Sequence, residues 1–381
     1  MNRLNRRAFL GTVARAGAAT VAFASLPAWA RRALAAPPGL IVRNDWPEHL
    51  ETSLASLGRA YITPNDTFFV RNHLLPPAID TAAWRLEIAG LVNAPYSLSL
   101  AELRTLDQSE AVHTLECAGN GRALMQLPST SGTQWERGAV GNAAWGGVRL
   151  ATLLERAGVK PEAKHVWFEA ADRDPLPTAP VFLRSIPIEK AMDDTLLAHR
   201  MNGVALPQAH GAPLRAIVPG WYGMASAKWV TKIRLEAAPS DNHFMAKGYR
   251  YAYPGEDPAT AAPVETLRVK SVITRPLEGA RVPGGKLRVQ GFAWAGASGV
   301  RVVEISTDGG AHWQPAGFMG DNHPLAWRGW ATQVPIERGA TLTLMARASD
   351  NAGEAQPMVA RANAGGYGNN SIQVVKVHAL G

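Results

Sequence analysis

Cysteine is almost absent from this sequence: Cys117 is the only one in 381 residues. A single thiol excludes an intramolecular disulfide, a Cys-x-x-Cys site and covalent attachment of a c-type haem. Three roles remain for Cys117. It is a small buried hydrophobe, a nucleophile, or the one thiolate ligand of a metal that another group mainly holds.

Acidic residues are missing from the first 36 positions, which contain six arginines. Among them Arg6 and Arg7 precede Phe9-Leu10 and an Ala/Gly/Val-rich stretch, with small-residue cleavage candidates at residues 28–30 and 33–35. This pattern predicts a twin-arginine signal peptide over residues 1–36 and a periplasmic location. An ordinary secretory leader or an anchor helix is the alternative.

Long apolar runs are missing after the leader, so we expect no membrane span once it is removed. Removal of residues 1–36 lowers the net charge from +8 to +2; cleavage after Ala30 leaves +4. The high isoelectric point therefore does not indicate nucleic-acid binding, and no nucleic-acid motif is present. A small anion is the partner that clustered arginines favour.

The residues around Cys117 argue against a merely buried thiol. The stretch Thr114–Arg122 reads TLECAGNGR. Gly119 and Gly121 allow a close approach of the backbone, and Asn120 tolerates left-handed geometry. Arg122 is a fixed cation that favours thiolate over thiol. The pattern predicts a loop that presents the sulfur to a bulky ligand.

TLECAGNGR resembles the metal-binding loop of the sulfite oxidase family of molybdopterin-dependent oxidoreductases. The resemblance implies a Mo-molybdopterin cofactor whose molybdenum takes Cys117 as its thiolate ligand, beside two dithiolene sulfurs and two oxygens. Such a cofactor is inserted in the cytoplasm, which fits export of a folded protein. No stretch has the length or composition of the family's haem domain, so we expect no haem in this chain. Electrons would leave to a separate protein, such as a c-type cytochrome.

A second match is FVRNH at residues 69–73, which follows Phe68 at the end of an expected buried strand, Phe68–Val70. The resemblance implies pterin contacts for Phe69, Val70, Asn72 and His73. It gives Arg71 contact with the substrate anion as well as a place among the cofactor residues. Taken alone, Arg71 would be read as a surface salt-bridge partner.

The third match lies at residues 206–215 and 226–229. Imidazole and cationic groups suit a phosphate-bearing cofactor, and the resemblance places the pterin phosphate against His210, Arg215 and Lys228. The resemblance also implies cofactor contacts for Ser226 and Ala227 in the same stretch. Asp172 stands where the family has a pterin-contacting acid, although a turn carboxylate explains it equally well.

Tyr249 falls where the family keeps an active-site tyrosine. A phenol there can position substrate or water by hydrogen bonding. Tyr251 and Tyr253 are the alternative registers. The expected catalytic residues are therefore Arg71, Cys117 and Tyr249.

The periodicity predicts an α+β protein. Strands are expected at residues 84–91, 165–171 and 216–218, and capped helices at 99–106 and 150–157. Residues 254–263 have the composition of a linker. Beyond it, strands near 287–291, 300–305, 342–348 and 372–377, with a hairpin at 307–310, predict an immunoglobulin-like β-sandwich.

By resemblance, residues 37–263 form the mixed α/β molybdopterin-binding catalytic domain. Residues 264–381 form the dimerisation domain, so a homodimer is expected. One departure is clear: the family's C-terminal substrate arginine has no counterpart in residues 361–370. The expected activity is oxidation of sulfite to sulfate. Alternatives are a sulfane-sulfur dehydrogenase subunit, a reductase of the same superfamily, and an exported non-catalytic binding protein.

Overall fold

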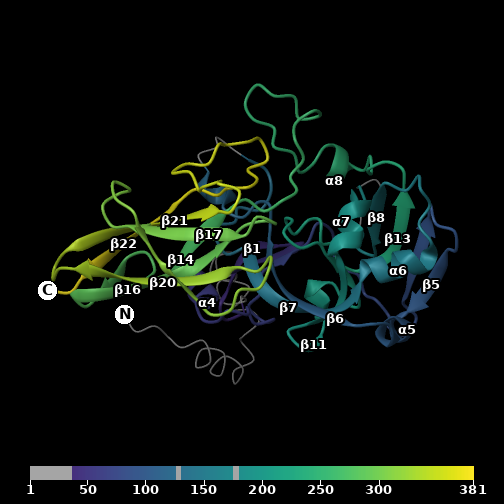
Figure 1. Ribbon diagram of the computed structural model, residues 1–381, viewed down its shortest axis with the longest axis horizontal. Helices are drawn as coiled ribbons and strands as arrows, with labels where there is room; N and C mark the ends of the chain where they lie inside the picture. The colour runs from purple at the N-terminus through teal and green to yellow at the C-terminus, as the bar shows by residue number, and fades with distance from the viewer. Residues whose placement is uncertain (1–36, 126–129, 175–179) are drawn as a thin grey trace, which may run out of the picture.

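The computed structural model of the protein describes residues 37–125, 130–174 and 180–381, so the predicted export leader lies outside the described part. Five β-sheets and several short helices make up these residues, which confirms the α+β class. Figure 1 shows two parts side by side along the longest axis, a mixed part and an all-β part that ends at the C-terminus. Within the described residues, every helix is too short or too polar to traverse a bilayer.

Three sheets form the mixed part. The first has the order β1-β2-β3, the second β11-β10-β7-β6 with β12 also on β10, and the third β5-β4-β13-β8-β9. In the third sheet, β4 and β13 run parallel. The strands are β1 Leu40–Asp45, β2 Glu48–Thr52, β3 Val70–Arg71, β4 Arg85–Gly90, β5 Tyr96–Ser99, β6 Ser109–Glu116, β7 Val140–Arg149, β8 His165–Ala170, β9 Leu183–Pro187, β10 Leu196–Met201, β11 Val204–Ala205, β12 Arg215–Ile217 and β13 Val230–Glu236.

The helices of this part are α4 Leu54–Leu57, α5 Leu100–Thr105, α6 Leu150–Ala157, α7 Ile188–Asp193 and α8 His243–Ala246. Both predicted helices are confirmed. Ser99 and Glu102 form a reciprocal capping box at the start of α5. Gly158 ends α6 with φ +66°, and its N–H donates to the carbonyls of Leu154 and Glu155.

The strand predicted at Phe68–Val70 was wrong in its bounds. Pairing with β2 sets the strand at Val70–Arg71, where Leu50 faces Val70 and His49 faces Arg71. Arg71 is therefore held by a backbone ladder, and Asn72 and His73 follow directly after it.

The long strand β7 was not predicted from the sequence, because its glycines are typical of loops. A Cβ at Gly147 would lie 1.9 Å from the carbonyl oxygen of Leu197 on the neighbouring strand β10. Glycine is thus required by close strand packing. Strand β7 also pairs with the whole length of β6, from Ser109 opposite Gly147 to Glu116 opposite Val140, and so supports the residue before Cys117.

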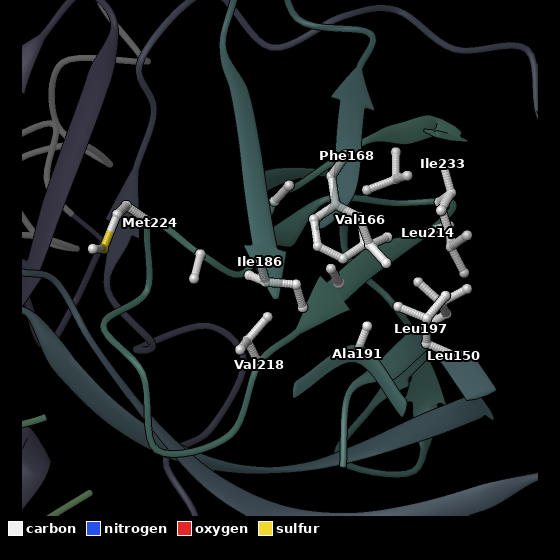
Figure 2. Packing of buried hydrophobic residues seen from close by; sticks show 14 of the residues in the cluster. Leu150, Val166, Phe168, Ile186, Ala191, Leu197, Leu214, Val218, Met224 and Ile233 are labelled. Atoms are coloured by element: carbon white, nitrogen blue, oxygen red, sulfur yellow. The ribbon is translucent and has the colours of Figure 1, made fainter. Parts of the chain in front are cut away.

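The core of the mixed part lies between its sheets and helices. Figure 2 shows Leu150, Leu197, Phe168 and Ile233 packed together, with Met224 at one end of the group. Met224 also lines a recess described below, so the same packing that stabilises the fold fixes a wall of the candidate site.

The all-β part is a two-layer sandwich, as predicted. Its sheets have the orders β14-β16-β20-β19 and β15-β22-β21-β17-β18. Trp330 and Val289 of one sheet share a core with Leu344 and Val375 of the other. The strands are β14 Lys270–Arg275, β15 Ala280–Val282, β16 Gly285–Trp294, β17 Val300–Ser306, β18 Gln314–Pro315, β19 Gly317–Met319, β20 Arg328–Ile336, β21 Thr341–Asp350 and β22 Gln373–Ala379.

The predicted hairpin at residues 307–310 joins β17 to β18, which pair at Ile305 and Gln314. The two parts of the chain also contact each other directly. The buried Trp327 donates from its backbone N–H to Oγ1 of Thr114 (2.7 Å) and from Nε1 to the carbonyl of Tyr61 (2.9 Å). The sandwich part therefore packs against β6, the strand that ends directly before Cys117.

Candidate active site

Cys117 stands at the turn that follows β6. Its N–H donates to the carbonyl of Ala139 (2.9 Å), and its own carbonyl accepts from the N–H of Asn120 (2.8 Å). Gly121, at φ +93°, takes the left-handed conformation, which Asn120 does not adopt. Asn120 instead spans the turn with its side chain, donating to Oε1 of Glu116 (2.9 Å) and accepting from the N–H of Ala139 (3.1 Å).

Two recesses meet at Cys117. The first encloses about 690 Å³ and the second about 1050 Å³, open solvent at their mouths included. They share Arg71, His73, Cys117 and Tyr249. The first recess is also lined by Phe68, Phe69, Leu115, Ala118, Asp172, Phe182, Ala209, His210, Arg215, Gly223, Met224, Ser226, Lys228 and Trp229.

Most of the predicted cofactor residues therefore come together in the first recess, although they are far apart in the sequence. Three do not line it. Val70 is buried in a small core with Leu40 and Leu50, and Ala227 lies in the main core. Asn72 lines the second recess and accepts a hydrogen bond from Nζ of Lys228 at its Oδ1.

Cations dominate the first recess: Arg215 is buried, and Arg71 and Lys228 are half-buried. Carbonyl oxygens hold two of them: Arg215 donates to His210 (2.9 Å) and Ser226 (3.1 Å), and Lys228 to Ala209 (2.9 Å). Burial lowers the pKa of Arg215 to about 9. Burial, and then the neighbouring Arg215, lowers the pKa of Lys228 well below its usual range. Burial thus disfavours the charged forms of these side chains, and an anion bound between them would stabilise those charged forms.

Unpartnered polar atoms support the same conclusion. Within the described residues, Nη1 of Arg71, Nε of Arg215 and Oδ1 of Asp172 are buried without a hydrogen-bond partner. Buried polar atoms are normally paired, so these three atoms point to a ligand that would satisfy them. The recess thus has the chemistry of a site for a polar, negatively charged group.

Among the described residues that line this cationic recess, Asp172 is the one carboxylate, and burial raises its pKa to about 6. A carboxyl whose pKa is raised on folding costs stability above that pKa, and the cost disappears below its unfolded value near 4. In the cofactor-free protein, Asp172→Asn should therefore stabilise the fold by roughly 3 kcal/mol at pH 7.5 and by only about 0.5 kcal/mol at pH 4. Urea unfolding at the two pH values tests this.

The same substitution in the loaded protein should lower cofactor retention if Asp172 contacts the pterin. Unchanged retention would leave Asp172 as a turn carboxylate. A loss of stability at pH 7.5 would mean that a partner compensates the buried charge.

Tyr249 lines both recesses, whereas Tyr251 and Tyr253 line neither and contact Arg268. Tyr249 has the left-handed φ of +55°, and its Oη lies 2.5 Å from Nε2 of His73. Burial raises the pKa of Tyr249 to about 12 and lowers that of His73 well below 6.5. Both groups are therefore neutral at pH 7, joined by one short hydrogen bond.

The second recess contains residues that the sequence did not indicate. His49 bonds the carbonyl of Asn72 (2.7 Å) and Oγ1 of Thr133 (2.7 Å), and Arg43 bonds the buried Glu51 (2.5 Å). They line the same recess as Cys117 because the β1–β2 hairpin pairs with β3. The recess is lined by Arg43, Asn44, Pro47, His49, Asn72, Gly119, Arg122, Ser131, Gly132, Thr133, Gln134, Trp135 and Tyr367 besides the four shared residues.

Arg122 serves as a link between the two parts of the chain. Its Nε donates to the carbonyl of Gly365 (2.9 Å), its Nη1 to that of Thr133 (2.8 Å), and its guanidinium lies over the ring of Tyr367. The sandwich part thus gives the second recess an aromatic ring, Tyr367, and no cation. Arg361 lies outside both recesses, exposed and paired with Glu256.

Comparison with known proteins agrees with this geometry. A family model described as "Oxidoreductase molybdopterin binding domain" matches residues 73–244, and one described as "Mo-co oxidoreductase dimerisation domain" matches residues 261–380. A single thiol at the edge of an anion recess, in this pair of domains, defines a molybdenum-dependent oxidoreductase. The alternative of a non-catalytic binding protein is therefore wrong.

Several relatives narrow the class further. Sulfite oxidase of Gallus gallus is 38% identical over 84% of this chain and 73% of that protein, and mitochondrial sulfite oxidase of Homo sapiens is 37% identical over 84% and 62%. The sulfane dehydrogenase SoxCD from Paracoccus pantotrophus matches in structure with a TM-score of 0.78 and 32% identity, covering 86% of this chain and 84% of that one. The chain belongs to the sulfite oxidase family of molybdopterin-dependent oxidoreductases.

The residues present fit the family's molybdenum cofactor. Cys117 offers a soft sulfur ligand at the junction of the two recesses. The unpartnered atoms of Arg71 and Arg215, with Lys228 and His210 nearby, suit the phosphate and polar edges of a pterin. His210 is neutral, since burial lowers its pKa to about 3.

Proposed function

We propose that this enzyme oxidises sulfite to sulfate and passes the electrons to an external acceptor, such as a c-type cytochrome. The observation that carries the proposal is Arg71. Its guanidinium lines both recesses beside Cys117, and its buried Nη1 has no partner within the described residues. A small oxyanion suits this place, and the similarity to sulfite oxidases supports sulfite as that anion.

When bound, the molybdenum group supplies the two-electron oxidation and the oxygen transfer. The chain's own residues do the rest. Arg71 holds the anion by charge-assisted hydrogen bonds, with Arg122 and Tyr367 on the wall of the second recess. In the tautomer of neutral His73 that donates its Nε2–H to Oη, Tyr249 can donate its own O–H to an oxygen of the anion.

A substrate panel tests the proposal. The purified, molybdenum-loaded enzyme is given sulfite, thiosulfate, a protein-bound persulfide or a sulfoxide, with an oxidised or reduced dye as the electron partner. Sulfite should have the highest kcat/KM with the oxidised dye. A higher value for the persulfide, or turnover of the sulfoxide with reduced dye alone, would contradict it.

Sulfane-sulfur oxidation is the second candidate. It is favoured by the similarity to SoxCD over most of both chains and by the volume of the second recess, about 1050 Å³ with the open solvent at its mouth included. A recess of that size can admit a carrier segment as well as a free ion. The persulfide in the panel separates this candidate from the first.

The proposed location is the periplasm, reached by the twin-arginine route. Replacing Arg6 and Arg7 together by Lys should leave the loaded protein in the cytoplasm, because twin-arginine recognition depends on the guanidinium pair. Cell fractionation with an activity stain measures this. Replacing Arg31 and Arg32 by Lys is the matched control and should not change export. Normal periplasmic accumulation of the Arg6/Arg7 variant would contradict the route.

The proposed assembly is a homodimer through the sandwich, with residues 37–263 as the catalytic domain and 264–381 as the dimerisation domain. The match of residues 261–380 to a dimerisation domain supports it. Light scattering of the full chain should give twice the protomer mass. A chain cut after Pro263 should run as a monomer, but it also loses contacts to the Cys117 loop and is expected to be unstable. A monomeric full chain would contradict the proposal.

A further inference from the structure

A buried ion pair that the proposed chemistry does not use joins the sandwich to the residue before Cys117. Nζ of Lys270, the first residue of β14, lies 2.8 Å from Oε1 of Glu116, the last residue of β6. Their side chains are only 4% and 1% exposed. Removing two charges from water costs several kcal/mol each, so such a pair persists only in well-satisfied geometry.

Every oxygen of this carboxylate is satisfied. Oε1 of Glu116 accepts from Lys270 and from Nδ2 of Asn120 (2.9 Å), and Oε2 accepts from Nε1 of Trp294 (2.8 Å). Nζ of Lys270 also lies 3.3 Å from the carbonyl of Asn120. Two sandwich side chains thus fix both residues that flank the turn at Cys117.

The C-terminal segment of the sandwich holds the rest of the same turn. The N–H of Gly368 donates to the carbonyl of Ala118 (2.8 Å), and Nδ2 of Asn369 donates to that of Gly121 (2.7 Å). From the mixed part, the N–H of Gly223 donates to the carbonyl of Glu116 (2.7 Å). The turn is therefore clamped between the two parts of the chain.

We infer that Lys270 and Trp294 are positioning residues for Cys117: through Glu116 and Asn120 they fix the direction of its sulfur at the junction of the recesses. The sandwich is then part of the active site as well as an assembly domain. This inference rests on the proposed function only in taking Cys117 as the metal ligand.

The test removes the pair without leaving an unpaired charge. Glu116→Gln/Lys270→Met keeps one carbonyl acceptor, which can serve either Asn120 or Trp294, and loses the Lys270 contacts. Trp294→Phe is a second variant that removes a single donor. Arg347→Gln/Glu304→Gln is the matched control, because it deletes an ion pair of the sandwich (2.8 Å) that has no contact with the turn.

Two readouts are made on the full chain. In the loaded enzyme, the Glu116/Lys270 variant should lose at least about tenfold in kcat, roughly 1.4 kcal/mol, with KM for sulfite nearly unchanged because Arg71 is intact. Its Mo(V) paramagnetic resonance signal should also shift. In chain prepared without cofactor, the rate at which an aromatic disulfide reagent modifies the thiol should rise severalfold, and Cys117 is the only thiol that can react.

The Arg347/Glu304 control should match wild type in all of these. A Glu116/Lys270 variant with wild-type kcat, resonance signal and thiol rate, or one that differs only in melting temperature, would overturn the inference. The rate of thiol modification tests the positioning role independently of the proposed substrate. If sulfite is not oxidised by any form but the thiol rate still rises in the variant, the positioning role stands and the proposed substrate falls.

Discussion

Replacing Cys117 by serine is expected to lower kcat by roughly three orders of magnitude or more, about 4 kcal/mol in activation free energy. A serine hydroxyl is a poor substitute for a soft thiolate ligand. The fold should persist, because the turn is held by backbone hydrogen bonds to Ala139 and Asn120 that do not involve the sulfur. Turnover with a dye acceptor, molybdenum content and thermal unfolding are the three measurements.

The content measurement sharpens this expectation. His210, Arg215 and Lys228 remain in the first recess, so the serine variant should still retain part of its cofactor. Low activity with substantial molybdenum identifies Cys117 as a ligand needed for chemistry. Wild-type turnover of the variant would show that the ligand assignment is wrong.

Replacing Arg71 by glutamine is expected to lower kcat/KM for sulfite by one to two orders of magnitude. A charge-assisted hydrogen bond from a desolvated cation contributes roughly 1.5–3 kcal/mol, and about 1.4 kcal/mol corresponds to a factor of ten. The effect should be large here because the sandwich contributes Tyr367, and no cation, to the lining of the second recess. Steady-state kinetics over a range of sulfite concentrations measures it.

Two further variants frame the Arg71 result. Tyr249→Phe should act mainly on kcat, since it removes the hydroxyl bonded to His73 but no charge. Arg361→Gln is the matched control, because that arginine is exposed and lies outside both recesses. If Arg71→Gln leaves kcat/KM for sulfite intact while another substrate suffers, sulfite is not the native substrate.

The parts of the candidate site predicted from the sequence are those whose residues lie close together in the chain. The Cys117 turn, residues 69–73 and the stretch around His210 each carry several site residues close together in the chain, so a short motif reveals them. The sandwich was predictable for the same reason, because two-residue periodicity is a local signal. Capping residues at Ser99 and Gly158 likewise marked two helix ends.

The remaining parts depend on tertiary packing. His49 and Arg43 reach the second recess only because a hairpin far ahead of Cys117 pairs with β3. Tyr367 arrives from the opposite end of the chain and stacks on Tyr249 with ring centroids 5.0 Å apart. The ion pair of Glu116 and Lys270 spans 154 positions. Neither hydrophobic periodicity nor a short motif predicts such long-range contacts.

The bond from Asn369 to Gly121 joins residues 248 positions apart. Gly121 is synthesised long before Asn369. The nascent chain therefore carries Cys117 in a turn that lacks this hydrogen bond until translation is nearly complete. The complete turn at Cys117 is accordingly expected to form only after the C-terminal segment has been synthesised.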